Sequence, residues 1–363
     1  MIPITKPFMP PRAEYEEYLE GIWQREYLTN NGPLVQELEA KLRAYLDIEH
    51  LLFVSNGTIA LQIAINALGL KGEIITTPYS YVATASSIVW EGCTPVFVDI
   101  DEHTLNIDPN LIEDAITDTT SGIIATHVYG NPCDMEAIQE IADKYDLKVI
   151  YDASHCFGTE FEGKSVFDYG DVSTVSFHAT KLYHTIEGGA VISRHEDVNH
   201  KISRMRNFGH AGPGNFEGVG INGKNSEFHA AMGLCILNYI DEILVSRKNQ
   251  WLRYADFLTY ANARGITIHP AANFNYAYFP VVFESETVML KVKASLEKNE
   301  IYPRRYFYPS LSELDYMEGP LLNRTYDISK RVLCLPLYYD LIKEEQKKVI
   351  SVIQENIKEV VYE

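Results

Sequence analysis

Short apolar runs alternate with amphipathic segments through the first half of the chain, and this alternation most constrains the fold. The apolar runs are typical of strands buried on both faces, and they are LLFV (51–54), EIITTP (73–78), PVFVDI (95–100), SGIIATHVYG (121–130), LKVIYDAS (147–154), DVSTVSF (171–177) and GAVISR (189–194). Apolar residues at helical spacing fill the segments 58–70, 82–92 and 134–146, and Asp108 followed by Pro109 predicts another helix start. The pattern predicts an α/β fold with a mostly parallel central sheet covered by helices.

The spacing of apolar residues changes after about residue 245. Longer helical stretches follow, together with separate strands such as NYAYFPVVFE (275–284). At 363 residues the chain is long enough to bury two cores. We therefore expect a large α/β domain over residues 1–245, which includes the N-terminal segment, and a smaller α+β domain over residues 246–363.

Charge and composition exclude several kinds of partner. The formal net charge is −19, and the densest basic run, KISRMR (201–206), fits one face of a helix. Binding to nucleic acid or to an anionic membrane needs a basic patch, so neither partner is expected. No apolar run is as long as a membrane span, and the N-terminus has no secretory apolar region. Five well-separated cysteines without a CxxC motif predict reduced thiols in a cytoplasmic protein.

Three features fall at the carboxyl ends of predicted strands, where parallel α/β sheets bind their ligands. SNGTIAL (55–61) joins a strand to a helix, and Gly57 and Thr58 at the helix start suit a phosphate. Asp152 ends a hydrophobic strand, where burying a carboxylate costs free energy unless the group is paired or hydrogen-bonded. Lys181 follows another buried strand, and no acid lies between it and Glu187. Each feature also has a plainer interpretation: a helix cap, a structural salt bridge and a surface lysine, respectively.

Together the three features match what pyridoxal phosphate requires of a protein. That cofactor needs an anion-binding turn, an acid that keeps its ring nitrogen protonated, and an amine for a Schiff base. A sheltered lysine such as Lys181 loses its proton more readily and can then attack a carbonyl group.

Ordered sequence agreement over most of the chain adds a resemblance to a known family. The matching segments are SNGTIALQIAINALGL, TTPYSYVATASSI, PVFVDID, HVYGNPCDM, DASHCFGTEFEGKSVFDYGDVSTVSFHATK, EGGA and LPLYYDL. In these segments the chain resembles the DegT/DnrJ/EryC1/StrS sugar aminotransferases, which are fold-type I pyridoxal-phosphate enzymes. The resemblance implies pyridoxal 5′-phosphate, with its pyridoxamine form, as the cofactor, and a homodimer with shared active sites.

The family pattern also implies roles for individual residues. Lys181 resembles the lysine that forms the Schiff base and moves the proton, and Asp152 matches the acid that pairs with the pyridinium nitrogen. A lysine rather than a histidine at position 181 favours amino transfer over sugar deoxygenation. The remaining cofactor positions that the resemblance implies are Gly57, Thr58 and Ser176 at the phosphate, Tyr81 stacked on the ring, His155 near the ring, and Asn222, which reaches the phosphate of the neighbouring subunit's cofactor.

A narrower pattern bears on the substrate. Gly223 and Lys224 replace a Tyr-Arg pair that many family members carry, and Ile186 replaces a frequent glycine, so the broad family says little about the sugar. PITKPFMPP, WQREYLTNNGPLVQELE, SFHATK and GINGKNSE are similar to the dTDP-4-amino-4,6-dideoxyglucose transaminases of O-antigen pathways. This resemblance implies dTDP-4-keto-6-deoxy-D-glucose as amino acceptor and L-glutamate as donor.

Two other functions stay open at this point. One is an aminotransferase for a 3-keto sugar or for a GDP-linked, perosamine-type sugar. The other, more remote, is a non-catalytic regulatory protein that binds pyridoxal phosphate, against which the intact pair of Lys181 and Asp152 argues.

Six further residues are candidates for substrate binding, and they are Thr29, Asn30, Asn31, Arg304, Arg305 and Tyr308. The first three form a turn before a helix, where they fit either a sugar nucleotide or a simple helix cap. The two arginines suit a diphosphate, and the tyrosine lies where relatives bring a C-terminal loop to the substrate. His178 and His184 flank Lys181 without a carboxylate or thiol at ligand spacing, so no metal site is expected.

Overall fold

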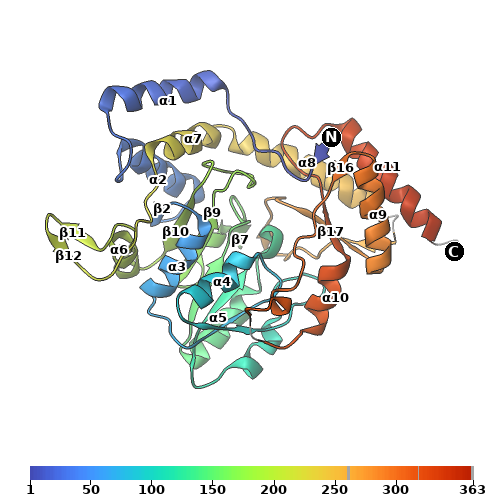
Figure 1. Ribbon diagram of the computed structural model, residues 1–363, viewed down its shortest axis with the longest axis horizontal. Coiled ribbons are helices and arrows are strands. Elements are labelled where there is room, and N and C mark those ends of the chain that lie inside the picture. Colours follow the sequence, from blue (N-terminus) through green and yellow to red (C-terminus); the bar gives the residue numbers. More distant parts are fainter. Residues whose placement is uncertain (260–261, 318, 361–363) are drawn as a thin grey trace.

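A seven-stranded sheet crosses the centre of the computed structural model, which describes residues 1–259, 262–317 and 319–360 (Figure 1). From edge to edge its strands are β2 (Leu51–Val54), β10 (Gly189–Ser193), β9 (Val172–Ser176), β6 (Lys148–Asp152), β5 (Thr120–Thr126), β3 (Glu73–Thr76) and β4 (Thr94–Phe97). Neighbouring strands are parallel except at β10, which runs antiparallel to both β2 and β9. The predicted α/β fold with a mostly parallel sheet is confirmed.

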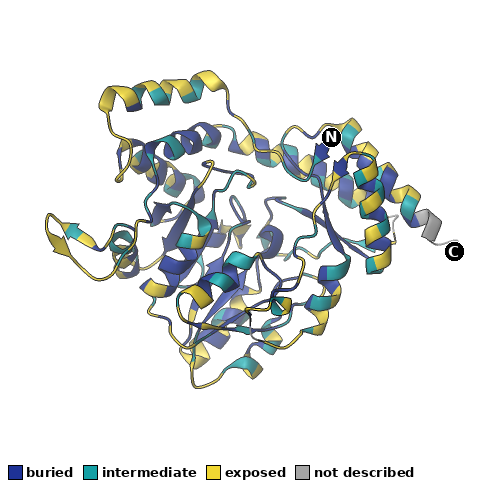
Figure 2. Cartoon of the chain, in the orientation of Figure 1, coloured by how far each residue is buried: buried dark blue, intermediate teal, exposed yellow. Residues whose placement is uncertain are grey.

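Helices cover both faces of this sheet because successive strand residues point to opposite sides. In β2, Phe53 belongs to the core of one face, whereas Leu52 and Val54 belong to the core of the other. The first face packs against α2 (Pro33–Leu46), α5 (Met135–Tyr145) and α7 (Glu227–Leu237), and the second against α3 (Gly57–Ala67) and α6 (Glu196–Met205). Figure 2 shows the strands and the inward sides of these helices as buried. The helix α1 (Arg12–Arg25) lies outermost, and α4 (Val82–Trp90) packs against α3.

A second core lies in the C-terminal part of the chain. The antiparallel sheet of this part has the order β13 (Ala263–Arg264), β15 (Phe279–Phe283) and β17 (Val332–Leu335). Around it lie α8 (Ile240–Leu258), α9 (Glu286–Lys298), α10 (Asn323–Arg331) and α11 (Lys343–Val360). The boundary predicted between residues 245 and 246 falls inside α8, and the division into a large domain and a smaller α+β domain stays a prediction.

Segments far apart in the sequence join the two parts. The N-terminal strand β1 (Ile2–Pro3) pairs in parallel with β16 (Ile301–Tyr302), so the start of the chain lies beside the C-terminal part (Figure 1). In the same way β14 (Ala272–Asn273) pairs with β7 (Glu160–Phe161), which also pairs with β8 (Lys164–Ser165). These pairings fix the C-terminal part against the edge of the large sheet where its strands end.

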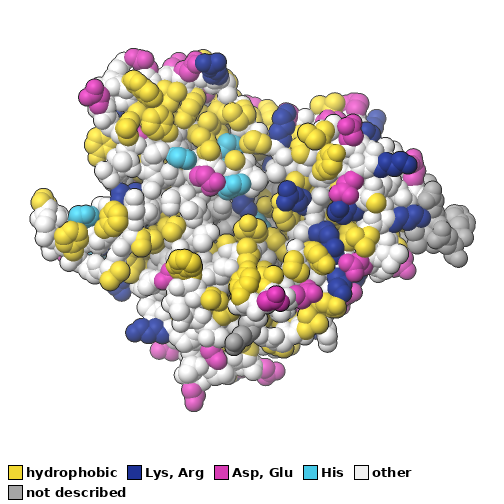
Figure 3. Space-filling view, viewed as in Figure 1, with side chains coloured by type: hydrophobic (Ala, Val, Ile, Leu, Met, Phe, Trp, Pro, Cys, Tyr) yellow, Lys and Arg dark blue, Asp and Glu magenta, His cyan; other side chains and the backbone are white. Residues whose placement is uncertain are grey.

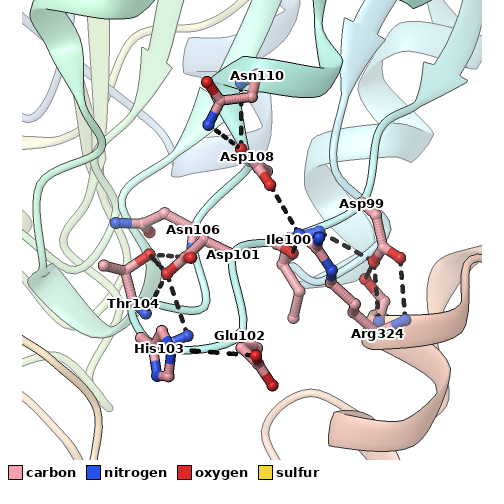
Figure 4. Close-up of polar contacts among 11 residues, drawn as sticks. Asp99, Ile100, Asp101, Glu102, His103, Thr104, Asn106, Asp108, Asn110 and Arg324 are labelled. Atoms are coloured by element: carbon pink, nitrogen blue, oxygen red, sulfur yellow. Dashed lines mark hydrogen bonds and ion pairs between the residues drawn. The ribbon is translucent and has the colours of Figure 1, made fainter.

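A network of acids after β4 holds the start of α10 (Figure 4). Asp99 accepts hydrogen bonds from the backbone N–H groups of Arg324 and Thr325, both at 2.9 Å, and from the Thr325 hydroxyl at 2.7 Å. Arg324 in turn donates to the carbonyl of Ile100 at 3.1 Å and to Asp108 at 2.7 Å. The first N–H groups of a helix have no acceptor inside that helix, so Asp99 acts as a capping residue supplied from another part of the chain.

The predicted strand over residues 121–130 is wrong at its end. The strand β5 stops at Thr126, and Val128–Gly130 forms a single 3₁₀ turn. The N–H of Val128 donates to the side chain of Asn106 at 2.8 Å, and the N–H of Tyr129 donates to His155 Nδ1 at 3.2 Å. Because side chains take these N–H groups, the backbone leaves the sheet there. The helix start predicted at Asp108 is a short 3₁₀ turn (Pro109–Leu111) whose Asn110 N–H bonds to the Asp108 carboxylate.

A hairpin of β11 (His210–Gly212) and β12 (Asn215–Phe216) follows α6 and extends away from the body of the molecule, at the left of Figure 1. The remaining short elements are single 3₁₀ turns at Glu113–Ala115, Val166–Asp168 and Leu311–Glu313. In the described residues no single helix is long and apolar enough to cross a membrane. Taken together, α7 and α8 have the length and composition of a membrane span, but they are bent by 62° relative to each other.

Candidate active site

A cavity of about 650 Å³ opens where the strands of the large sheet end and the C-terminal part begins. Eight of the residues singled out in the sequence line it together, and they are Gly57, Thr58, Tyr81, Asp152, His155, Ser176, Lys181 and Arg304. Most of them stand at or just after the end of β2, β6 or β9, which is where a parallel sheet gathers its ligand-binding residues.

The start of α3 forms an anion-binding wall of this cavity. Asn56 caps the helix by accepting a hydrogen bond from the N–H of Ile59 at 2.9 Å. The N–H groups of Gly57 and Thr58 open the helix, where they have no acceptor within it. A side chain at Gly57 would place its Cβ 3.0 Å from Ser176 Cβ, so only glycine leaves this close approach undisturbed. Backbone N–H groups and two hydroxyls at a helix N-terminus suit a phosphate.

Asp152 is buried and well supplied with hydrogen-bond donors. Its Oδ2 accepts from the Thr84 hydroxyl at 2.7 Å, and its Oδ1 accepts from the hydroxyl and the N–H of Ser154 at 2.6 and 3.2 Å. The Thr84 hydroxyl also bonds to Ser80 Oγ at 2.7 Å. Donors of this kind stabilise an ionised carboxylate and fix its direction, and here they hold the charge at the cavity wall.

Lys181 presents an amine whose ammonium form is disfavoured. Although the side chain borders the cavity, burial lowers the pKa of Lys181 from its ordinary 10.5 to about 8, against the opposing effect of the Asp152 charge. Its Nζ donates to the hydroxyl of Tyr278 at 3.4 Å. With this pKa roughly a tenth of the Lys181 side chains are free amine at pH 7, the form that attacks a carbonyl.

Aromatic rings form the other walls. The His155 ring lies parallel to that of Phe307, with centroids 5.9 Å apart, and its Nδ1 accepts the N–H of Tyr129. Burial and the nearby Lys181 charge lower the pKa of His155 well below its ordinary value, so the ring is neutral and carries its proton on Nε2. Tyr81 precedes α4 with 62% of its surface exposed, and it lines the cavity with a ring free to cover a flat ligand.

Six candidate residues do not line the cavity, and they are Thr29, Asn30, Asn31, Asn222, Arg305 and Tyr308. The first three stand in the loop before α2, where Asn30 and Asn31 have positive φ angles of 62° and 58°. Arg305 pairs with Glu286 at 3.0 Å and stacks on Tyr308 at 3.4 Å, so its charge is used within the C-terminal part. Asn222 is exposed and accepts a hydrogen bond from Lys224 at 2.8 Å.

The sequence did not predict that several other residues line the cavity, and these include Asn56, Ser80, Thr126, Ser154, His178, Glu187, Tyr278, Tyr306 and Phe307. Ser154 had a local signal, since it follows Asp152 by two residues in YDAS. The aromatic residues had none, because they come from loops of the C-terminal part more than 90 residues further along the chain. Among the described residues, no three His, Cys, Asp or Glu side chains gather as a metal site requires.

The cavity fits pyridoxal phosphate in its donor set. A phosphate matches the N–H groups at Gly57 and Thr58, a pyridinium nitrogen matches the Asp152 carboxylate, and an aldehyde matches the Lys181 amine. A side chain at position 57 would crowd Ser176, one of the residues at this phosphate end.

Comparison with known proteins points the same way. Residues 11–354 match the model of the DegT/DnrJ/EryC1/StrS aminotransferase family. The chain is 45% identical to a dTDP-4-amino-4,6-dideoxy-D-glucose transaminase of Shigella dysenteriae, over 97% of this chain and 98% of that protein. It is 43% identical to a protein of the same name from Escherichia coli, with the same coverage. The structure of DesI in the presence of its TDP-sugar product superposes with a TM-score of 0.92 at 30% identity, covering 98% of this chain and 92% of that one.

Proposed function

Because the chain belongs to the DegT/DnrJ/EryC1/StrS aminotransferase family, we propose that it transfers the amino group of L-glutamate to dTDP-4-keto-6-deoxy-D-glucose. The products are 2-oxoglutarate and dTDP-4-amino-4,6-dideoxy-D-glucose. The observation that carries this proposal is a lysine amine of lowered pKa in the same cavity as a buried, hydrogen-bonded aspartate. The sugar and its nucleotide come from the printed names of the two relatives that match nearly the whole chain.

The cofactor of this enzyme is pyridoxal 5′-phosphate, which supplies an electron sink that makes a C–H bond next to the amino group acidic. Asp152 keeps the ring nitrogen protonated in this proposal, since its carboxylate is fixed by Thr84 and Ser154. Gly57, Thr58 and Ser176 bind the phosphate through N–H and hydroxyl groups.

Lys181 acts as the base and acid of both half-reactions. Its amine accepts the proton from Cα of L-glutamate, and later gives a proton to C4 of the sugar. The pKa of about 8 suits this exchange, because a group that takes up and releases a proton works best near the ambient pH. The neutral imidazole of His155 and the ring of Tyr81 both line the cavity and would contact the flat cofactor.

Arg304 is the proposed contact for the anionic part of the substrates. It lines the cavity, is exposed, and keeps its backbone fixed by pairing with Cys334. A guanidinium at this place suits the diphosphate of a sugar nucleotide or the carboxylates of glutamate. Tyr308 and the loop of Thr29, Asn30 and Asn31 remain candidates for the sugar nucleotide once a second subunit is present.

We also propose a homodimer with shared active sites. Apolar side chains gather over the region of α1 on the face seen in Figure 3. The exposed large apolar residues of α1 and of the loop that follows it include Trp23, Tyr27 and Leu28. The segment of the projecting hairpin exposes Phe216 and Val219, and it leads directly to Asn222. Exposed apolar surface of this extent favours association, and a partner's Asn222 would complete the phosphate site. Location in the cytoplasm and a role in O-antigen synthesis stay predictions.

An absorption spectrum of the purified enzyme tests the proposed reaction directly. A visible band that bleaches with L-glutamate and returns with dTDP-4-keto-6-deoxy-D-glucose is expected, with the amino sugar identified by mass spectrometry. Bleaching that only a 3-keto or GDP-linked sugar reverses would replace the substrate. A protein without any band after addition of pyridoxal phosphate would contradict the proposal as a whole.

Replacement of the lysine gives the sharper test. Lys181→Ala removes the amine that binds the cofactor and moves the proton, so turnover should fall by at least about 10³-fold. Lys164→Ala, at an exposed lysine of β8, is the matched control and should retain full activity. Normal turnover by the Lys181→Ala enzyme would rule out the assigned role.

A further inference from the structure

Tyr278 reaches the reacting lysine from a distant part of the chain. It stands just before β15 in the C-terminal part, 97 residues after Lys181, yet its hydroxyl oxygen lies 3.4 Å from Lys181 Nζ. The same ring lies against His155, with centroids 4.7 Å apart. Tyr278 therefore touches both the amine and a wall of the cavity.

The segment that carries Tyr278 is fastened to the loop that follows Asp152. Asn275 donates from Nδ2 to the carbonyls of His155 and Phe157 at 2.8 and 2.9 Å, and its Oδ1 accepts from the N–H of Ala277 at 3.1 Å. All these groups are buried, so the hydrogen bonds are shielded from water. The position of the Tyr278 ring is thereby set relative to the catalytic loop rather than left to the C-terminal part alone.

Two further contacts hold the backbone of this segment. The buried guanidinium of Arg247 donates to the carbonyl of Ala277 at 3.0 Å, and Trp251 Nε1 donates to the carbonyl of Tyr278 at 3.2 Å. Both residues belong to α8, so a long helix supports the tyrosine from behind. The lysine side chain has four rotatable bonds, whereas the phenol ring that it contacts is held in place by its surroundings.

The phenol can bond to the lysine in either of its charge states. Burial raises the pKa of Tyr278 well above its ordinary value, so its hydroxyl keeps its proton throughout the working range of pH. A phenol accepts a hydrogen bond from an ammonium group and donates one to a neutral amine.

We propose that Tyr278 is a positioning residue whose hydroxyl holds Lys181 Nζ in place both as ammonium and as amine, through one hydrogen bond that reverses its direction. The proposal rests on the proposed function, in which Lys181 takes a proton from one carbon atom and gives it to another. Between these events the amine is free of the cofactor, and the hydrogen bond to Tyr278 keeps it pointed into the cavity. Loss of the hydroxyl should slow proton transfer without weakening substrate binding.

Tyr278→Phe removes the hydroxyl and keeps the ring contacts. The matched control is Tyr276→Phe, two residues earlier, whose ring packs on Trp251 and Phe274 and which does not line the cavity. In the loaded enzyme Tyr278→Phe should lower kcat about tenfold, with KM for L-glutamate and for the keto sugar unchanged within about twofold. Tyr276→Phe should leave both constants as in the wild type.

A second readout needs no cofactor. The rate at which trinitrobenzenesulfonate labels Lys181 in the cofactor-free protein, followed by peptide mass spectrometry from pH 6 to 10, gives the pKa of the amine. The hydrogen bond from the ammonium form to the phenol oxygen is charge-assisted and therefore stronger than the bond from the phenol to the neutral amine. Loss of both in Tyr278→Phe should therefore lower the pKa of Lys181 by about half a unit to one unit. Tyr278→Met, which also lacks a hydroxyl, should give a shift in the same direction.

The outcomes separate this proposal from the one on which it rests. An unchanged Lys181 pKa in Tyr278→Phe, or a kcat equal to that of the wild type, would overturn the positioning role while the aminotransferase stands. A change in KM alone would make Tyr278 a substrate contact instead and would also overturn it. A wild-type enzyme without transaminase activity would sink the proposed function, and the labelling experiment would still decide whether Tyr278 holds the lysine.

Discussion

Lys181 is shifted toward the neutral amine because protein surrounds it, and this gives the cavity a defined dependence on pH. Its pKa of about 8 is the balance between burial, which lowers the value, and the charge of Asp152, which raises it. The other groups that face it include Tyr81, Cys156, His155 and Tyr278. The pKa of His155 is lowered well below the range of interest and that of Cys156 is raised well above it, so neither titrates there.

The rate at which cofactor-free enzyme binds pyridoxal phosphate should therefore follow the titration of Lys181. Only the neutral amine reacts, so the rate should rise about tenfold per pH unit below pH 8 and level off above it. Stopped-flow absorbance between pH 6.5 and 9.5 measures this profile. In Asp152→Asn the midpoint should move below that of the wild type, because a charge that raises the pKa is gone. A wild-type rate that still climbs at pH 9.5 would show an ordinary lysine.

The local sequence pattern predicted the cavity residues that stand at strand ends. It did not predict those that reach the cavity from helices or from the C-terminal part of the chain. Gly57, Asp152, Ser176 and Lys181 each lie within a few residues of a strongly apolar run, so their common edge followed from the predicted parallel sheet. Thr84 gave no signal, since its hydroxyl faces Asp152 from the buried side of a helix rich in small residues. Its role depends on the packing of α4 over β6, which periodicity does not specify.

At the scale of elements, the cap on α10 connects the two parts of the chain through hydrogen bonds. Asp99 follows β4 of the large sheet, whereas the N–H groups that it accepts belong to the first turn of a helix more than 200 residues later. Asp99→Ala leaves those N–H groups without their acceptor and should lower the free energy of unfolding by about 1–2 kcal/mol. Urea denaturation measures the loss.

The control for this prediction is an acid that lies on α10 itself. Asp327 pairs with Arg331 one turn later on the surface of α10, and Asp327→Ala should cost at most about 0.5 kcal/mol. Equal losses in the two variants would show that Asp99 acts only as one more surface acid.

Element ends were less predictable than element types. The run 121–130 is apolar to its end, yet the side chains of Asn106 and His155 take the backbone N–H groups of Val128 and Tyr129. Those two acceptors stand 22 and 26 residues from their donors in the sequence, so no local pattern announced the turn. The same turn brings Tyr129 beside the aromatic wall of the cavity, next to Tyr278 and Phe307.

At the scale of the whole molecule, the proposed shared active sites can be tested by mixing two inactive enzymes. In a dimer of Lys181→Ala with Asn222→Ala, one site combines both defects and the other combines an intact Lys181 with the partner's intact Asn222. Random mixing of equal amounts makes half of the dimers mixed, so about a quarter of the wild-type activity should return. Activity is measured after the subunits have exchanged.

No recovery, with mixed dimers demonstrated by mass spectrometry, would place Asn222 in its own subunit's site or outside both sites. Asn222 does not line the cavity of its own chain, and this position is what makes the mixed dimer informative.

The pairing of Ile2 with Ile301 has a consequence for the order in which the protein is completed during its synthesis. Ile2 is made before any strand of the large sheet, whereas Ile301, with which it pairs, is made only after all seven of them. The backbone of Ile2 therefore has no strand to pair with until residue 301 has been made, although Thr5 already meets the backbone of Thr180 in the large part. The large sheet can form as the chain emerges, whereas the cavity can close only after Tyr306 and Phe307, which line it, have been made.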